Sequence, residues 1–501
     1  MTRAPQTREK LANDIWRACD ILRRDNNCGG VMEYVEHLSW LLFLRFLDAQ
    51  EEEWESQALL AEREYQPVIE KPYRWRDWAT KDWPPDELLS FVHGQLIPYL
   101  QVLSGTPLRD TIRGVFSERN VIVCASPYNL KDVLSIINSI DFHSQDDIFT
   151  VSQVYEELLR RLGNENRLAG EFYTPRPVVR FVVEVTNPQI GETVYDPACG
   201  TCGFLAEAYL WMQRQERTLE DHKTLQERTF FGQEKKPVPA LLGVMNMVLH
   251  GVTAPHILRK NTLEENIRQV VGHYDVILTN PPFGGTEGRH IQQNFPVQSQ
   301  ATELLFLQHI MKKLKPRDGA RCGMVVPEGT LFRTGAFAEV KRSLLEEFNL
   351  HTIVSLPPGT FAPYSDVKTA LLFFERPGPT REIWYYELPL PEGLKKFSRG
   401  NPIKDEHFEE ARRLWQAWDA YRKGQGSREA CLSEHSWIVP VDEIQARGYD
   451  LSARNPYRKE TEALPPPMEI VASLLERERE ILSIMEELDE LLGNNTEGAE
   501  A

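Results

Sequence analysis

The stretch that decides the fold is YDVILTNPPFGG, residues 274–285. It begins as an apolar run rich in β-branched side chains, as expected of a buried strand in a parallel sheet. The strand stops at Asn280, Pro281, Pro282 and Phe283, because the prolines have no N–H to donate to a ladder. It therefore presents a rigid loop at its carboxyl end, where open α/β sheets bind ligands. An amide, a proline carbonyl and an aromatic ring suit a flat ring that bears an amine, although Asn-Pro is also common in simple turns.

Length and charge limit the possible functions. A chain of 501 residues predicts about three domains. The net charge of −17 argues against a protein that wraps nucleic acid by itself, since such binding depends on Lys and Arg. A local basic groove, or a partner that supplies the phosphate contacts, stays compatible with this charge.

The cysteines and the N-terminus indicate the compartment. Seven scattered cysteines, an odd number, favour a reducing environment without a disulfide framework. The N-terminal MTRAPQTREK contains no apolar core of a signal peptide, and no run approaches the roughly 18 apolar residues of a membrane span. We expect a cytoplasmic protein with no membrane partner.

The apolar periodicity divides the chain into regions. Residues 1–145 predict a helical bundle domain, and residues 146–169 a helical connector. Strands alternate with helices over 170–400, which predicts an α/β domain with a doubly wound, mainly parallel sheet. The expected strands are 193–195, 229–232, 256–258, 274–279, 323–326, 352–356 and 369–374, and the expected helices between the earlier ones are 204–213, 238–249 and 303–314.

The C-terminal part is expected to be helical. Residues 401–464 predict a helical extension, and three prolines at 465–467 predict a stiff linker. Residues 468–492 then repeat apolar pairs at heptad spacing, which indicates an amphipathic helix that binds a partner helix or docks on its own chain. The acidic tail after it has the composition of a disordered segment.

A second motif, VYDPACGTCGF at residues 194–204, predicts a cofactor site. A strand that runs through a small-residue turn into a helix brings a ligand close to backbone N–H groups. Asp196 at the strand end is placed to meet a cationic group, and Glu234, at the end of the next strand, to accept from ribose hydroxyls. Cys199 and Cys202 form a CxxC, but zinc would require a second ligand pair, so small filler residues are favoured over a metal or redox site.

Two further segments are candidates for the same cleft. GEFYTPRP at residues 170–177 places Phe172 and Tyr173 to pack over a ligand, with Pro175 and Pro177 making an extended approach to the first strand. The alternative is an interdomain connector. Asn261 ends the third strand, one loop away from Asn280.

In this order, the motifs resemble those of the DNA adenine-N6 methyltransferases. More narrowly, the chain resembles the modification subunits of type I restriction–modification systems. That resemblance covers roughly residues 8–460 and rests also on the helical N-terminal domain, on LPPGTF at 356–361 with KTA at 368–370, and on GYDLSARNP at 448–456. NPPF alone also occurs in methyltransferases for RNA guanine or protein glutamine, whereas the ordered set is specific.

The resemblance implies a Rossmann-like methyltransferase that uses S-adenosylmethionine, without a metal, to methylate N6 of a flipped adenine in double-stranded DNA. Two residues depart from the family pattern: Cys202 stands where glycine is frequent, and Asn261 where an acid is common. The implied catalytic residues are Asn280, Pro281, Pro282 and Phe283. The implied cofactor residues are Glu171, Phe172, Tyr173, Thr174, Pro175 and Arg176 over the cofactor, Asp196, Gly200, Thr201, Cys202 and Gly203 at its methionine part, Glu234 at its ribose and Asn261 by its adenine.

The resemblance also implies partners. A DNA-specificity subunit would bind through the N-terminal domain and residues 468–492, with a second copy of this chain and optionally a restriction (translocase) subunit in the complex. Two alternatives remain: a catalytically weak scaffold subunit, and an amino-methyltransferase for RNA.

Overall fold

The computed structural model describes residues 8–60, 62–117, 123–140, 142, 174–252, 255–270, 272–362 and 365–457, with residues 478, 479 and 485. The chain divides into two units, Met1–Arg454 and Asn455–Ala501. The predicted connector 146–169 and linker 465–467 lie outside the described residues. So does the predicted helix 468–492, apart from helical Glu478, Arg479 and Met485.

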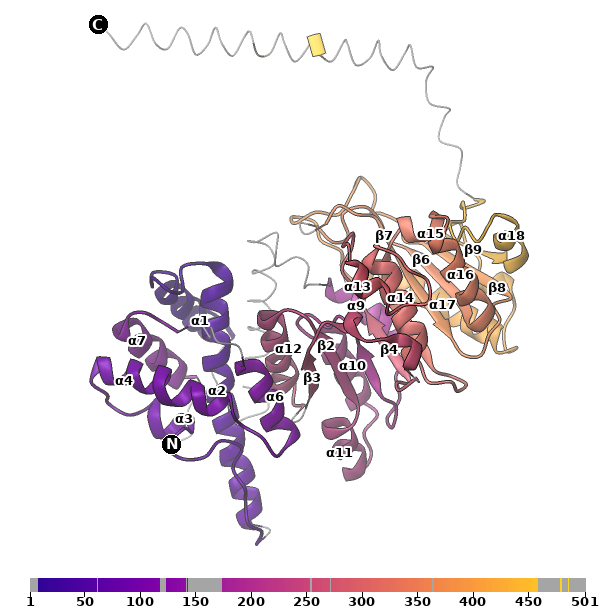
Figure 1. Cartoon of the computed structure of the whole chain (residues 1–501). Helices are drawn as coiled ribbons and strands as arrows, with labels where there is room; N and C mark the ends of the chain where they lie inside the picture. Colours follow the sequence, from indigo (N-terminus) through magenta and orange to yellow (C-terminus); the bar gives the residue numbers. More distant parts are fainter. Residues whose placement is uncertain are drawn as a thin grey trace, which may run out of the picture. The chain divides into compact units, whose positions relative to one another are not determined.

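The N-terminal region is helical, as predicted (Figure 1). A long apolar helix, α2, packs against α1 and α7 because its middle turns are apolar nearly all round. Two contacts join this helical region to the sheet region. Helix α2 contacts α12 (Pro237–Leu249), and Thr111 Oγ1 of α6 donates a hydrogen bond to the Pro255 carbonyl. The helices are α1 (Arg8–Leu22), α2 (Val31–Leu60), α3 (Trp75–Trp78), α4 (Pro85–Phe91), the π-helix η1 (Val92–Leu96), α5 (Ile97–Leu100), α6 (Pro107–Phe116) and α7 (Pro127–Asn138).

A sheet of nine strands follows, in the order β3-β2-β1-β4-β5-β7-β6-β8-β9. The first five neighbours in this order are all parallel, so their carboxyl ends meet at one edge. The strands are β1 (Val194–Asp196), β2 (Phe230–Glu234), β3 (His256–Arg259), β4 (Val276–Thr279), β5 (Arg321–Pro327), β6 (Asn349–Ser355), β7 (Thr369–Glu375), β8 (Glu382–Glu387) and β9 (Ser436–Pro440).

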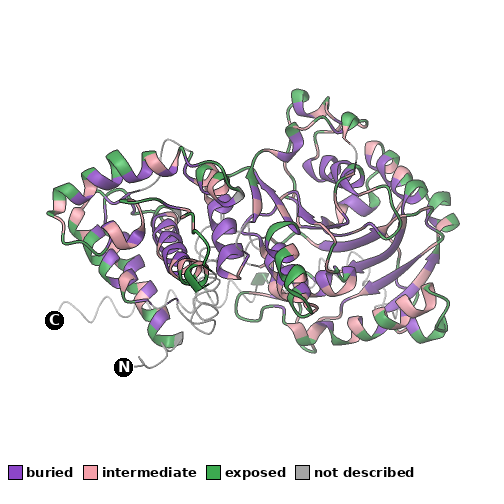
Figure 2. Cartoon of the chain, turned by 90° about the horizontal axis from the view of Figure 1, so that it is seen from below, coloured by how far each residue is buried: buried purple, intermediate pink, exposed green. Residues whose placement is uncertain are grey.

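Helices cover both faces of this sheet, which confirms the doubly wound α/β fold (Figure 2). Side chains alternate between the faces: in β4, Val276 and Leu278 join one core and Ile277 the other. The first face is covered by α9 (Arg176–Thr186), α10 (Gly203–Gln213) and α12 (Pro237–Leu249), with α11 (Leu219–Glu227) beside α10. The second face is covered by α14 (Thr302–Lys313) and α16 (Ala336–Glu347).

The second half of the sheet departs from a parallel arrangement. β7 lies between β5 and β6 and is antiparallel to both. β8 and β9 were not expected from the sequence. β9 comes from the region 401–464, so the prediction of a purely helical extension is wrong: a strand of this region completes the sheet by pairing antiparallel with β8.

The extension also covers the sheet with a helix, α17 (Glu409–Arg422). Arg412 of α17 forms an ion pair with Glu184 of α9, and Phe181 of α9 stacks on Phe408 with ring centroids 4.8 Å apart. Apolar surface of β8 and α17 is buried only in this joint arrangement, which short sequence patterns do not encode.

The predicted extended approach before the first strand is also wrong in part. Pro175 is extended, with φ −54° and ψ 130°, but α9 begins at Arg176 and contains Pro177 in its first turn. Proline is tolerated there because the first helical N–H groups have no intrahelical partner. A short helix α13 (Arg289–Gln292) and the 3₁₀ turns η3 (Thr262–Glu264) and η4 (Ile267–Gln269) complete the rim near β3 and β4.

Candidate active site

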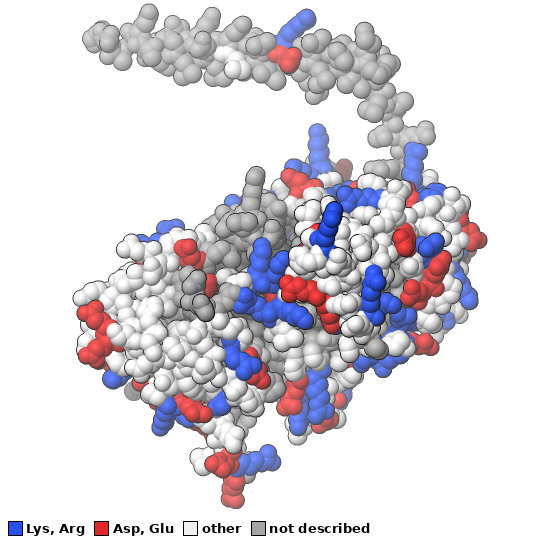
Figure 3. Space-filling view, viewed as in Figure 1, with Lys and Arg blue, Asp and Glu red and all other residues white. Residues whose placement is uncertain are grey.

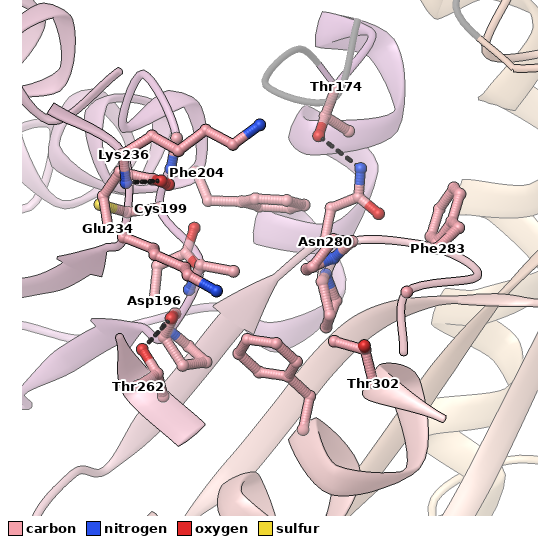
Figure 4. A pocket seen from close by; sticks show the side chains of 18 of the residues that line it. Thr174, Asp196, Cys199, Phe204, Glu234, Lys236, Thr262, Asn280, Phe283 and Thr302 are labelled. Atoms are coloured by element: carbon pink, nitrogen blue, oxygen red, sulfur yellow. Dashed lines mark hydrogen bonds between the residues drawn. The ribbon is translucent and has the colours of Figure 1, made fainter. Parts of the chain in front are cut away.

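A cavity of about 480 Å³ lies at the carboxyl ends of β1, β2 and β4 (Figure 4). The loops after these three strands form its wall, because parallel strands end at the same edge of the sheet. Two loops face each other across it: the loop after β4 carries Asn280 to Phe283, and the loop after β1 runs from Pro197 to Gly203.

Asn280 is held at one end of its side chain and unpaired at the other. Its Nδ2 donates to Thr174 Oγ1 at 3.0 Å, which fixes the amide plane (Figure 4). Its Oδ1 is buried and has no hydrogen-bond partner within the described part of the chain. A buried oxygen without a donor is costly, so this acceptor requires an explanation, and a ligand N–H in the cavity would supply one.

Phe283 is half-buried on the same loop and is held by a second aromatic ring. Phe361 meets it edge to face, with ring centroids 5.8 Å apart and planes at 82°. This contact leaves ring surface of Phe283 in the cavity wall beside Asn280.

The loop after β1 closes tightly onto α12. Gly200 and Cys202 both have positive φ, 50° and 58°. A Cβ on Gly243 of α12 would lie 2.9 Å from the Gly200 carbonyl oxygen and 2.7 Å from Cys202 Sγ. Cys202 therefore tolerates the left-handed conformation that glycine prefers, and its sulfur fills the space beside Gly243.

Cys199 and Cys202 are packing residues in this structure. Both are buried free thiols, and a Cβ on Gly232 would lie 3.0 Å from Cys199 Sγ. No third metal ligand joins the pair among the described side chains. The prediction of small filler residues agrees with this geometry.

Asp196 is a buried carboxyl group at the end of β1. Its Oδ1 accepts from Thr279 Oγ1 at 2.6 Å and from the Ala198 N–H at 3.0 Å. Burial raises its pKa to about 7, the two hydrogen bonds oppose this shift, and the negative charge of Glu234 adds to it. Such a group loses its proton readily when a cation approaches.

Glu234 at the end of β2 links two loops. Its Oε2 accepts from the Gly200 N–H at 3.0 Å, and its Oε1 from the Lys236 N–H at 2.8 Å (Figure 4). Burial raises its pKa, although these backbone N–H groups oppose the shift. Each carboxylate oxygen keeps capacity for a further donor, such as a ribose hydroxyl.

Arg176 and Asn261 also line the cavity. A Cβ on Gly203 would lie 2.5 Å from an Arg176 guanidinium nitrogen, so glycine makes room for the arginine. Desolvation lowers the pKa of Arg176 to about 10, and the charge of Glu207 opposes the shift. Asn261 caps η3, with Oδ1 accepting from the Leu263 N–H at 3.3 Å.

Most of the predicted site residues come together in this cavity. Pro175 and Cys202 are described and do not line it, because Pro175 precedes α9 and Cys202 points into the core. Glu171, Phe172 and Tyr173 lie outside the described residues. The predicted residues that line the cavity are Thr174, Arg176, Asp196, Gly200, Thr201, Gly203, Glu234, Asn261, Asn280, Pro281, Pro282 and Phe283.

Sequence reasoning missed several lining residues. Phe204 and Phe306 belong to helices α10 and α14, and Thr302 opens α14. Each belongs to an amphipathic or buried helix, so its pattern does not distinguish a cavity wall from a core. Phe361 lies in the LPPGTF segment, where its family motif was the available sequence clue.

The fold and the cavity at the carboxyl edge of the sheet define a class of protein. It is a doubly wound α/β protein with a cleft of the nucleotide-cofactor type and an NPPF loop. The model of the N-6 DNA Methylase family matches residues 144–463, and that of the HsdM N-terminal domain matches residues 11–137.

Relatives and solved structures agree with these matches. The EcoEI methylase subunit of Escherichia coli, a type I restriction enzyme subunit, is 41% identical over 95% of this chain and 96% of its own length. The EcoKI methylase subunit of Escherichia coli K12 is 31% identical over 81% of this chain and 76% of its own length.

Among solved structures, a chain from a study of complex assembly in the type I R-M system is 80% identical. It matches with a TM-score of 0.82 over 98% of this chain and 99% of that one. A modification subunit of a putative type I restriction enzyme from Vibrio vulnificus YJ016 is 41% identical, with a TM-score of 0.81 over 91% of this chain and 99% of that one.

This chain belongs to the N-6 DNA methylase family, as a methylase subunit of the type I restriction–modification systems. It is an adenine-specific DNA methyltransferase subunit. Within the described part of the chain, no helix combines the length and hydropathy required to cross a membrane.

Proposed function

We propose that the cavity at the ends of β1, β2 and β4 transfers the methyl group to N6 of an adenine flipped out of double-stranded DNA. The observation that carries this assignment is Asn280 Oδ1, a buried acceptor that has no donor within the described part of the chain and is fixed in place through Thr174. An exocyclic amine provides the N–H that this oxygen lacks.

Asn280 and Pro281 act together on the amine. Asn280 Oδ1 accepts one N6 hydrogen, and the Pro281 carbonyl accepts the other. Because the amine lone pair is delocalised into the adenine ring, the two acceptors favour a tetrahedral nitrogen whose lone pair is available for attack. Fixing the reacting nitrogen in this way is a positioning contribution to the rate.

Phe283 supports the flipped base. Its ring, held edge to face by Phe361, offers a surface on which adenine can stack. Stacking of a base on an aromatic side chain is worth about 1–3 kcal/mol, which offsets part of the few kcal/mol that flipping costs.

The opposite wall suits S-adenosylmethionine. This cofactor supplies a methyl group on a positively charged sulfur, which is electrophilic without a metal ion. Asp196, a buried carboxyl group that ionises near a cation, would hold the ammonium end, and Glu234 the ribose hydroxyls. Gly200, Thr201 and Gly203 would give close access to backbone N–H groups.

Three further groups of residues belong to this proposal through the family pattern. Arg176 and Asn261 line the cavity and would meet the cofactor, with Asn261 beside its adenine. Glu171, Phe172 and Tyr173 would cover the cofactor. Pro175 and Cys202 would act indirectly, by starting α9 and by shaping the turn.

DNA binding requires partners. The net charge is −17, and basic and acidic side chains are interspersed on the face in Figure 3, which suits a chain that shares phosphate contacts with a DNA-specificity subunit. The helical N-terminal domain and residues 468–492 are the proposed docking elements. A second copy of the chain, a restriction subunit and a cytoplasmic location complete the proposal.

The direct test is Asn280→Ala, assayed with the specificity subunit by transfer of labelled methyl groups to site-containing DNA. We expect about a 10²–10³-fold loss of rate, the scale for removal of one preorganised hydrogen-bonding group. Binding of S-adenosylmethionine, measured by calorimetry, stays within a few-fold of wild type.

Asn266→Ala is the matched control, because Asn266 is an exposed amide that caps η4 outside the cavity. Wild-type methylation by Asn280→Ala would refute the proposed role of the loop. Methylation of RNA in preference to DNA by the wild-type complex, or no methylation by it, would support the RNA or scaffold alternative instead. Deleting residues 468–492 should release the specificity subunit on co-purification.

A further inference from the structure

The N-terminal helical domain contains a cluster of potential metal ligands, far from the NPPF loop in the sequence. Cys28, His37 and Cys124 each offer one ligand atom, and these atoms all lie within 4.8 Å of one another. The three side chains are fully buried, and both cysteines are free thiols.

Three separate elements supply the cluster. Cys28 lies in the turn between α1 and α2, His37 lies in α2, and Cys124 precedes α7. The contacts of α1, α2 and α7 with one another bring together residues up to 96 positions apart. A ligand held here would therefore join all three helices.

His37 has no hydrogen-bond partner among the described residues. Neither Nδ1 nor Nε2 makes a hydrogen bond to any described residue, although the side chain is fully buried. Buried histidines that only fill a core normally donate at least one ring N–H, because an unpaired buried donor costs free energy. An imidazole whose lone pair has no donor, beside two thiols, points instead to an ion that accepts the lone pair of one ring nitrogen.

We propose that Cys28, His37 and Cys124 hold a structural zinc ion in the N-terminal domain. Two thiolates and one imidazole are the donors that Zn²⁺ prefers in proteins. Binding displaces one proton from each thiol, so two negative sulfurs balance the doubly charged cation and the buried site is neutral. A singly charged copper ion would leave a net negative charge beside Asp25, which disfavours it.

Asp25 positions the two cysteines. Its Oδ1 accepts from the N–H groups of Asn27 at 3.0 Å and Ala125 at 2.7 Å, which flank Cys28 and Cys124. Its Oδ2 accepts from the Ser126 N–H and from Asn129 Nδ2, both at 2.9 Å. Each oxygen thus has two donors, so Asp25 clamps together the two segments that carry Cys28 and Cys124.

The main test is the metal content of the full chain, expressed in zinc-supplemented medium and purified without chelators or immobilised metal. Mass spectrometry of metals should find roughly one zinc per wild-type chain, because buried donors take up the ion during folding. Cys28→Ala and Cys124→Ala should lose it. Cys19→Ala, which removes another buried thiol of the same domain, should keep it.

A second measurement uses wild-type protein alone, so it does not depend on the folding of variants. Replacement of zinc by Co²⁺ should give a thiolate-to-cobalt charge-transfer band, and removal of the metal should lower the melting temperature of the domain. Wild-type protein without zinc, equal zinc in Cys28→Ala, or copper in place of zinc would overturn the proposal. So would a Cys28–Cys124 disulfide in protein purified anaerobically, found by mass spectrometry after thiol alkylation.

Discussion

The two walls of the proposed active-site cavity differ in how their polar groups are hydrogen-bonded within the protein. The cofactor wall carries Asp196 and Glu234, and the NPPF wall carries Asn280 to Phe283. On the cofactor wall, Glu234 accepts from two backbone N–H groups, and Asp196 from a hydroxyl and a backbone N–H. On the NPPF wall, Asn280 Oδ1 is buried and has no partner among the residues that the structure describes. The carboxylates of the proposed cofactor wall are thus paired within the protein before any ligand binds, whereas this amide oxygen is not.

This difference in hydrogen bonding predicts that one wall contributes to cofactor binding and the other to methyl transfer. A carboxylate that already fixes the loop ends can accept a further hydrogen bond from a ligand without rearrangement. Little free energy is then spent on ordering the loops when the ligand binds. An acceptor fixed by Thr174 but left unpaired gains its hydrogen bond only with the amine in place. Changes on the cofactor wall should therefore alter cofactor affinity, and changes on the NPPF wall should alter turnover or DNA affinity.

After Asn280→Ala, the largest effect in this comparison is expected at Glu234. Glu234→Ala removes the acceptor for the Gly200 and Lys236 N–H groups, and with it the proposed contact to the cofactor ribose. We expect the Kd for S-adenosylmethionine to rise about 100-fold, since hydrogen bonds to charged groups contribute about 1.5–3 kcal/mol. Calorimetric titration would measure this, with exposed Glu227→Ala as control; an unchanged Kd would remove Glu234 from the cofactor site.

Phe283→Ala should act on the other wall. Loss of a stacking surface worth about 1–3 kcal/mol raises the KM for DNA by about 10–100-fold and leaves cofactor affinity unchanged. Steady-state methylation kinetics would test this, with Phe332→Ala, an exposed phenylalanine of α15 (Gly329–Phe332), as control. A rise in cofactor Kd of the same size would mean that the ring faces the cofactor instead.

Cofactor affinity should depend on pH through Asp196. Its pKa is raised from 3.8 to about 7, so the carboxyl group is largely protonated below pH 7 when no cation is bound. Because a cationic ligand requires the ionised form, affinity falls as pH decreases, by roughly fivefold from about pH 7 to about pH 6. Titrations of wild type and Asp196→Asn would test the sign: the variant should lack this dependence, and affinity that rises on acidification would contradict it.

The raised pKa of Asp196 also affects the folding stability of the cofactor-free chain. Since the pKa of folded Asp196 lies above its unfolded value, its ionisation opposes folding. This cost is absent below the unfolded pKa and complete above about pH 7. Denaturant unfolding of the cofactor-free chain should therefore show Asp196→Asn gaining stability relative to wild type as pH rises through this range.

The smallest effect is expected at Thr174. Thr174→Val removes the hydroxyl that accepts from Asn280 Nδ2 and frees the amide to rotate. The methylation rate constant should fall roughly threefold, the equivalent of one neutral hydrogen bond. Thr174→Ser keeps the hydroxyl and should restore the wild-type rate; equal losses in both variants would indicate a packing role.

Much of the active site was predictable because its residues follow strands. Asp196 and Glu234 end parallel strands and Asn280 directly follows one, and parallel topology places such ends at one edge. β8 and β9 were not predictable in the same way. Their apolar side chains are buried by α17, β6 and one another. The two strands therefore depend on contacts with residues that are distant in the sequence.

The amino-acid sequence by itself determined the strand that stops at the prolines of NPPF, the small-residue turn after Asp196 and the helical character of the N-terminal region. These features depend on residues close in the chain, through φ restriction, missing N–H donors and apolar periodicity. Only the tertiary structure decided that Thr174 holds Asn280 across 106 positions, that β9 closes the sheet and that Cys28 meets Cys124. Such contacts depend on how buried surfaces fit together, and no local pattern encodes that fit.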